Sequence, residues 1–185
     1  MSVIQANLID HVVPRSKVAD LSLVVGGAVL TAIAAQVQIP MYPVPMTLQT
    51  LAVLLIAAAL GPWRAFSSMS LYVAMGAAGL PVFAGAKSLT QVLPTAGYLL
   101  GFAVAAVVVG LIAQRGFAKK PLAVAISYAM GSVIIYFFGA GWLMLGLGLT
   151  FEQAFLAGIA PFLIGDAIKA SFAAALLPAA WKLVR

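Results

Sequence analysis

Residues 154–181 read AFLAGIAPFLIGDAIKASFAAALLPAAW, an apolar stretch long enough to cross a bilayer. It contains one acid and one base, Asp166 and Lys169, three positions apart. On a helix, side chains at this spacing project from the same face and are neighbours. A charge at membrane depth costs about 2.5–3.5 kcal/mol on insertion scales, so such groups face a bundle interior, a partner or a ligand.

The composition of the whole chain agrees with a membrane protein. Of 185 residues, 64% are hydrophobic and 8% are charged, whereas soluble domains average roughly 25% charged residues. The apolar runs lack the alternation of membrane-barrel strands, so the spans are predicted to be helical. There is no cysteine, and the single histidine, His11, lies in the polar N-terminal segment. A thiolate nucleophile is therefore excluded, and neither a metal site nor a cofactor is expected.

The apolar runs predict six transmembrane helices in a single membrane domain that covers residues 1–185. A polar tail, residues 1–20 with a short interfacial helix, comes first. The spans are expected over residues 21–38, 47–61, 65–80, 96–114, 121–143 and 153–181. Three prolines within residues 39–46 exclude a helix there and indicate a short, stiff loop. Thr150 and Gln153 have the spacing of a helix start at the last span.

The basic residues predict the orientation. Lys87 falls on one side of the membrane together with Glu152. The other basic residues of the six-span arrangement fall on the opposite side: Arg15, Lys17, Arg64, Arg115, Lys119, Lys120, Lys182 and Arg185. Positive charge concentrates on the cytoplasmic side, so both termini are expected there. The net charge of +6 is spread between apolar runs, which indicates loops next to a lipid bilayer and no nucleic-acid surface.

Three interpretations of Asp166 and Lys169 stay open from residue type alone: a structural pair, a proton or ion relay, and a site for a polar ligand. Pro161 and Gly165 are expected to loosen the helix just before the pair, and broken helices are common at transporter binding sites. A ligand for this pair should offer both donors and an acceptor, as a cyclic urea, an amide or an amino acid does. An enzyme is not expected, because the spans lack a histidine, a cysteine or a second carboxylate. The sequence also has no P-loop for ATP hydrolysis.

Two further features each allow two interpretations. Residues 81–95 form a long stretch rich in small residues, either a lid over a cavity or an ordinary connector. Ala28 and Ala32 form a pair of small residues one helical turn apart, which permits close helix packing within the chain or against another chain.

Several motifs together resemble those of one known family. They are PVPMTLQTLAVLL at 43–55, GLPVFAG at 79–85, PTAGYLLGF at 94–102 and PFLIGDAIK at 161–169. They are similar to those of the BioY family, the biotin-specific substrate-binding subunits (S components) of energy-coupling-factor (ECF) transporters. The resemblance runs through nearly the whole chain, although Ala96 stands where the family usually has glycine and Ser132 where a more polar residue is common.

The resemblance implies high-affinity biotin binding and uptake, with Asp166 and Lys169 at the ureido ring and the loop near Gly85 closing over the ligand. The full set of expected ligand-binding residues is Thr47, Gln49, Gly85, Tyr98, Asp166 and Lys169. It also implies a transmembrane coupling subunit, contacted through Ala28 and Ala32, and two ATPase subunits. The alternatives are an S component for another vitamin, such as thiamine or riboflavin, and a membrane scaffold whose charged pair is only structural.

Overall fold

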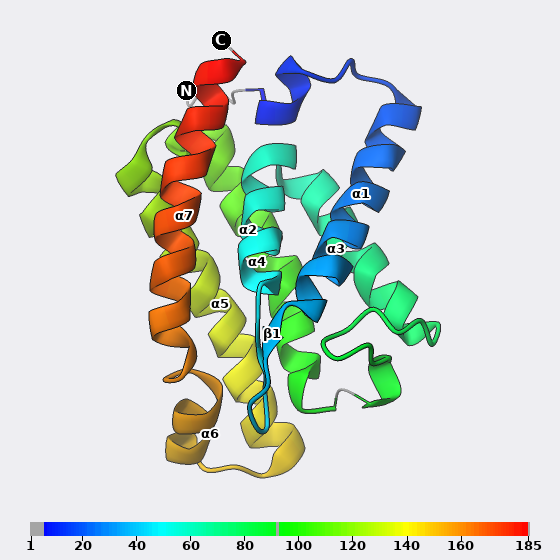
Figure 1. The fold of residues 1–185 in the computed structure, drawn as a ribbon, viewed down its shortest axis with the longest axis vertical. Helices are drawn as coiled ribbons and strands as arrows, with labels where there is room; N and C mark the ends of the chain where they lie inside the picture. Colours follow the sequence, from blue (N-terminus) through cyan, green and yellow to red (C-terminus); the bar gives the residue numbers. More distant parts are fainter. Residues whose placement is uncertain (1–5, 92, 185) are drawn as a thin grey trace.

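The computed structural model describes residues 6–91 and 93–184, and these form a bundle of helices (Figure 1). Short 3-10 helices lie at η1 (Leu8–His11), η2 (Leu89–Gln91), η3 (Leu93–Thr95) and η4 (Phe117–Lys119), and two short strands at β1 (Gln38–Ile39) and β2 (Met46–Thr47). The α-helices are α1 (Lys17–Gln36), α2 (Gln49–Leu60), α3 (Pro62–Ala77), α4 (Ala96–Gln114), α5 (Pro121–Leu147), α6 (Phe151–Gly158) and α7 (Phe162–Leu183).

Helices lie in each of the first five predicted spans, but they differ in length. Within the described residues, α1, α4, α5 and α7 are long and apolar enough to cross a membrane. The other two helices of the first five spans are shorter, with 12 residues in α2 and 16 in α3. The prediction of a helical fold is therefore confirmed apart from the two short strands, and a count of six crossings stays a prediction.

The sixth predicted span, residues 153–181, consists of two helices in the structure, and Pro161, which was expected to loosen the helix, lies between them. The helix is interrupted between α6, which ends at Gly158, and α7, which begins at Phe162. Pro161 has no backbone N–H to continue the helical ladder, and the N–H of Ala160 instead donates to the carbonyl of Phe155 in a wider turn. The expected helix start is confirmed, because Thr150 and Gln153 form a reciprocal capping box at α6.

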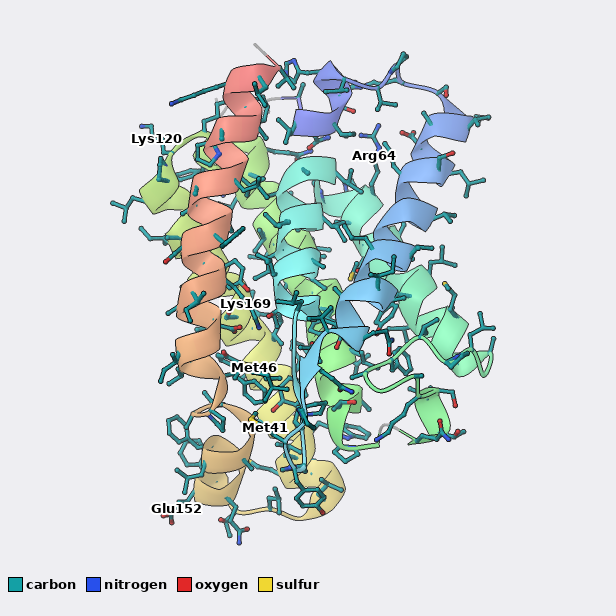
Figure 2. All side chains as sticks on the ribbon, in the orientation of Figure 1. Met41, Met46, Arg64, Lys120, Glu152 and Lys169 are labelled. Carbon is teal, nitrogen blue, oxygen red and sulfur yellow. The ribbon has the colours of Figure 1, made fainter. Side chains whose placement is uncertain are left out.

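The proline-rich segment forms a small hairpin between α1 and α2. Strand β1 pairs antiparallel with β2, with Gln38 opposite Thr47 and Ile39 opposite Met46. The prediction of a non-helical segment is confirmed, although the strand pairing was not predicted. A Cβ atom on Gly165 would lie 2.7 Å from the sulfur of Met46, so this glycine lets the hairpin pack closely on α7 (Figure 2). Gly165 thus lies inside α7 as a packing position and does not loosen the helix.

The described ends of the chain lie at the same end of the bundle, where η1 packs near the last turn of α7 (Figure 1). The ring centroids of His11 and Trp181 are 5.3 Å apart there. Asp10, whose side chain is 3% exposed, accepts from the guanidinium of Arg64 at 2.6 Å and from that of Arg15 at 3.1 Å. Arg64 also pairs with Asp20 of α1 at 2.6 Å. These ion pairs fasten η1 and α1 to α3. The sequence also predicts Arg185 on the same side of the membrane as Arg15 and Arg64, but Arg185 lies outside the described residues.

Asp10 predicts a pH dependence of stability. Burial alone would raise the pKa of its carboxyl, but hydrogen bonds from Arg64, Arg15 and Asn7 outweigh burial and lower the pKa to about 2 from the usual 3.8. The folded state therefore binds fewer protons than the unfolded state between these pH values, and stability rises with pH there. Asp10→Asn should cost roughly 2 kcal/mol above about pH 4, and the difference from the parent protein should vanish as the pH falls through 2. Thermal unfolding in detergent across this range measures it, and a pH-independent difference would contradict the assignment.

Candidate functional site

Asp166 and Lys169 lie one turn apart on α7 and face the interior of the bundle. Their exposed fractions are 6% and 7%, and the ammonium of Lys169 donates to Oδ1 of Asp166 at 2.9 Å. In Figure 2 Lys169 lies between the basic end, marked by Arg64 and Lys120, and the opposite end, marked by Glu152. The two charges predicted from the sequence to be neighbours thus form a buried ion pair well inside the bundle.

Two hydroxyl groups from other helices complete this cluster. Lys169 donates a second hydrogen bond to Oγ1 of Thr50 on α2 at 2.8 Å, and Thr50 lies 3.2 Å from Oδ1 of Asp166. The hydroxyl of Tyr136 on α5 donates to Oδ2 of Asp166 at 2.5 Å. We call Thr50, Tyr136, Asp166 and Lys169 the polar quartet. It joins three helices by hydrogen bonds to charged groups, which are stronger than neutral ones.

Thr50 and Tyr136 were not among the predicted site residues. Spacing along one helix places Asp166 beside Lys169, but the rotation of α2 and α5 relative to α7 decides which hydroxyls reach the pair. Their signal in the sequence was weak: Thr50 ends the TLQT motif and Tyr136 is one of several polar residues in its span. A buried carboxylate needs donors, and this requirement alone points to hydroxyls on facing helices.

Three members of the polar quartet lie in the wall of a pocket, which we call the inner compartment, and Asp166 lies behind them. Lys169, Thr50 and Tyr136 line the compartment, and its volume is about 50 Å³, roughly the space of two water molecules. The rest of the wall comes from the hairpin, the loop after α3, α2, α4 and α5: Val44, Pro45, Thr47, Gln49, Phe83, Ala84, Thr95, Tyr98, Leu99, Phe102 and Ile135. The pocket is thus apolar on most sides and polar at one end, as small-molecule sites usually are.

The structure places Thr47, Gln49 and Tyr98, three of the expected ligand-binding residues, in this wall, but their polar atoms already have partners. Gln49 donates its amide to the hydroxyl of Tyr72 at 2.7 Å and accepts from the hydroxyl of Thr47 at 2.9 Å. Tyr98 donates to the carbonyl of Gly158 at 2.7 Å. In this structure the three residues hold the wall together, so a direct contact with a ligand stays a prediction for each of them.

A second, larger hollow opens beyond the inner compartment, and we call it the outer compartment. It has a volume of about 300 Å³ and shares Pro45, Ala84 and Thr95 with the inner compartment. Gly85 lines only this outer hollow, together with Gln38, Pro40, Met41, Tyr42, Pro43, Lys87, Gln91 and Pro94. The structure therefore places Gly85 several residues away from the polar quartet and at the mouth of the site.

The loop between α3 and α4 is anchored over the inner compartment by Phe83. This ring is 2% exposed and packs edge-on against Tyr72, with ring centroids 5.1 Å apart. Its backbone pairs with that of Lys87, and the side chain of Gln36 bonds to the carbonyl of Phe83 at 3.1 Å and to the N–H of Ala86 at 3.0 Å. The segment is thus an ordered wall of the pocket, and its movement as a lid stays a prediction.

The predicted partner contact through α1 is only partly accessible. Ala28 is 0% exposed and belongs to the hydrophobic core, whereas Ala32 is partly buried. Ala28 therefore packs within the chain in this structure and offers no surface to another chain. The exposed apolar face of α1 instead carries Leu21, Val25, Val29 and Ile33. A contact between α1 and a coupling subunit stays a prediction that rests on this face and Ala32.

Comparison with known proteins places the chain in a family. The sequence model of the BioY family matches residues 7–185. The chain belongs to the BioY family. It is 36% identical over 159 residues to a probable biotin transporter BioY of Pyrococcus horikoshii, which covers 85% of this chain and 93% of that protein. It is 39% identical over 156 residues to the biotin transporter BioY of Rhodobacter capsulatus, covering 77% and 82% of the two chains.

The fold is also similar to that of a solved protein. The crystal structure of the S-component for biotin from an ECF-type ABC transporter superposes with a TM-score of 0.77 and 22% identity, covering 90% of this chain and 92% of that one. At this identity the likeness concerns the fold alone. Family membership and the apolar helices together make the chain a multi-pass protein of the cytoplasmic membrane.

Proposed function

We propose that this chain captures biotin and carries it across the cytoplasmic membrane as the substrate-specific subunit of an ECF-type transporter. The observation that carries the proposal is the polar quartet, which is a buried, charged end of an otherwise apolar pocket. Two relatives that are 36% and 39% identical to this chain over the aligned residues are named as a probable biotin transporter and a biotin transporter.

The chemistry of biotin suits such a pocket. Its fused ring carries a cyclic urea with two N–H donors and one carbonyl acceptor, and the sulfur-containing ring beside it is apolar. Asp166 is an acceptor that takes N–H donors, while Lys169 and Tyr136 are donors for the carbonyl. Ligand binding would replace some of the hydrogen bonds within the polar quartet by hydrogen bonds to the urea. Asp166 and Lys169 would then remain in direct contact or be bridged by the urea. The charged pair then has a ligand role, whereas the structural and relay interpretations leave the pocket unused.

Binding also requires the pocket to grow. The inner compartment of about 50 Å³ is too small for a fused bicyclic ring. The hairpin carrying Thr47 and the loop carrying Phe83 form its outer wall, and both are connecting segments rather than long helices. Connecting segments move more readily than packed helices. We infer that these two segments separate to admit biotin and close again around it.

The rest of the assembly follows from the transport role. We propose six crossings with both termini in the cytoplasm, because the basic residues gather at the end that carries η1 and the end of α7 (Figure 2). The outer compartment then opens to the outside. Energy would come from a transmembrane coupling subunit and two ATPase subunits, with no resident cofactor in this chain.

Equilibrium binding to the detergent-purified protein tests the proposal. Submicromolar binding of biotin is expected, and thiamine and riboflavin in large excess should not displace it. Displacement by either vitamin would assign the chain to another substrate. No binding of any of the three would favour the scaffold alternative, in which the charged pair has only a structural role.

A further inference from the structure

The outer compartment contains a cation that the urea of biotin does not use. Lys87 lines this compartment, and it makes no ion pair with any carboxylate of the described residues. By contrast, Lys169 in the inner compartment is neutralised by Asp166. In the part of the chain that the structure describes, Lys87 is thus the uncompensated positive charge of the two connected compartments.

The side chain of Lys87 lies close to Gly85 and to the side chain of Gln38. A Cβ atom placed on Gly85 would lie 3.8 Å from Cε of Lys87 and 3.3 Å from Nε2 of Gln38. The lysine stem and the Gln38 amide therefore converge over Gly85, which has a positive φ of 73°. The backbone of Lys87 is held by hydrogen bonds to Phe83 at 2.9 and 3.3 Å. The backbone that carries this charged side chain is thereby anchored at the mouth of the site.

We propose that Lys87, with the Gln38 amide beside it, forms a subsite for the carboxylate of the ligand. This inference rests on the proposed function. Biotin is neutral at its ring and anionic at the far end of a flexible aliphatic arm. A ring held at the polar quartet directs that arm through the shared wall of Pro45, Ala84 and Thr95 into the outer compartment. There the carboxylate meets an ammonium and an amide, which both donate hydrogen bonds to it.

The subsite acts on selectivity more than on total affinity. Lys87 is exposed, so water and salt screen its charge, and an exposed ion pair contributes little. The largest consequence is discrimination between the acid and neutral derivatives of the same ring. The positive charge of Lys87 at the mouth of the outer compartment also attracts an anionic ligand before the ligand enters the pocket.

Binding of two ligands to two variants tests the subsite. The ligands are biotin and biotin methyl ester, which differ in the negative charge, and the variants are Lys87→Gln and, as a matched control at the other end of the molecule, Lys120→Gln. Lys87→Gln should weaken binding of biotin roughly threefold to tenfold and leave binding of the ester unchanged. Lys120→Gln should change neither, and Lys87→Arg should bind biotin as the parent does.

The outcomes separate this inference from the proposed function. Equal effects of Lys87→Gln on both ligands, or no effect on either, would overturn the carboxylate subsite while leaving biotin binding intact. Failure of the parent protein to bind either ligand would instead overturn the proposed function itself. A second readout is salt: the preference of the parent for biotin over the ester should decrease as ionic strength rises, and Lys87→Gln should show no such decrease.

Discussion

Replacing Asp166 by asparagine is expected to weaken biotin binding roughly 5- to 150-fold. The change removes the negative charge that the urea N–H groups would meet, and a lost hydrogen bond to a charged group costs about 1–3 kcal/mol. It also leaves the charge of Lys169 without the carboxylate that neutralises it at 2.9 Å. Equilibrium binding of labelled biotin to the purified variant measures the effect. Glu152→Gln, at an exposed acid on α6, is the matched control and should keep the parent affinity.

A double replacement separates a ligand role from a structural one. Replacing a buried ion pair with apolar residues is often neutral or stabilising, whereas removing one partner costs about 3–5 kcal/mol. Asp166→Leu with Lys169→Leu should therefore remain folded, with a thermal midpoint close to that of the parent, and should lose measurable biotin binding. A folded double variant that still binds biotin with parental affinity would show that the pair is only structural.

Gly110→Ala is expected to cost roughly 2 kcal/mol or more of stability, at the upper part of the range for overpacked sites. A Cβ atom at Gly110 would lie 2.5 Å from the nitrogen and 2.6 Å from Cα of Pro62, and 2.9 Å from the carbonyl carbon of Gly61. These are backbone atoms of the tight turn between α2 and α3, so no side-chain rotation can relieve the clash. The turn or α4 must shift, and the shift would spread to both helices. Thermal unfolding in detergent measures the loss.

Gly141→Ala provides the opposite expectation on a neighbouring helix. A Cβ atom there meets no atom within 4 Å, and alanine favours a helix over glycine by about 0.5–1 kcal/mol in aqueous hosts. The two substitutions have the same chemistry and should have opposite signs. Equal effects at both positions would show that α4 does not pack on the α2–α3 turn as the structure has it.

Helical periodicity and composition predicted most of the fold. Charge scarcity identified a membrane protein, and the three prolines of residues 39–46 marked a non-helical segment. Pro161 indicated a loosened helix ahead of the charged pair, but residues 154–181 are apolar on both sides of it, so hydropathy alone did not divide the predicted span into α6 and α7. The β1–β2 pairing was missed because a two-residue ladder leaves no alternation to detect.

The candidate site was predictable only along one helix. Asp166 and Lys169 are three residues apart, so local geometry places them together. Thr50 reaches them across more than a hundred positions of sequence, and that contact depends on how α2 and α7 pack. The structure also separates residues that the family resemblance grouped into one ligand site, because Gly85 lies at the mouth whereas Thr47 and Tyr98 lie in the inner wall.

A structure of the protein with bound biotin tests the central claim most directly, namely that the polar quartet is the ligand-recognising end of the pocket. We expect the ureido ring in an enlarged inner compartment, with its N–H and carbonyl groups within about 3.2 Å of the head groups of Asp166 and Lys169. Biotin bound elsewhere, with all hydrogen bonds of the polar quartet unchanged, would contradict it.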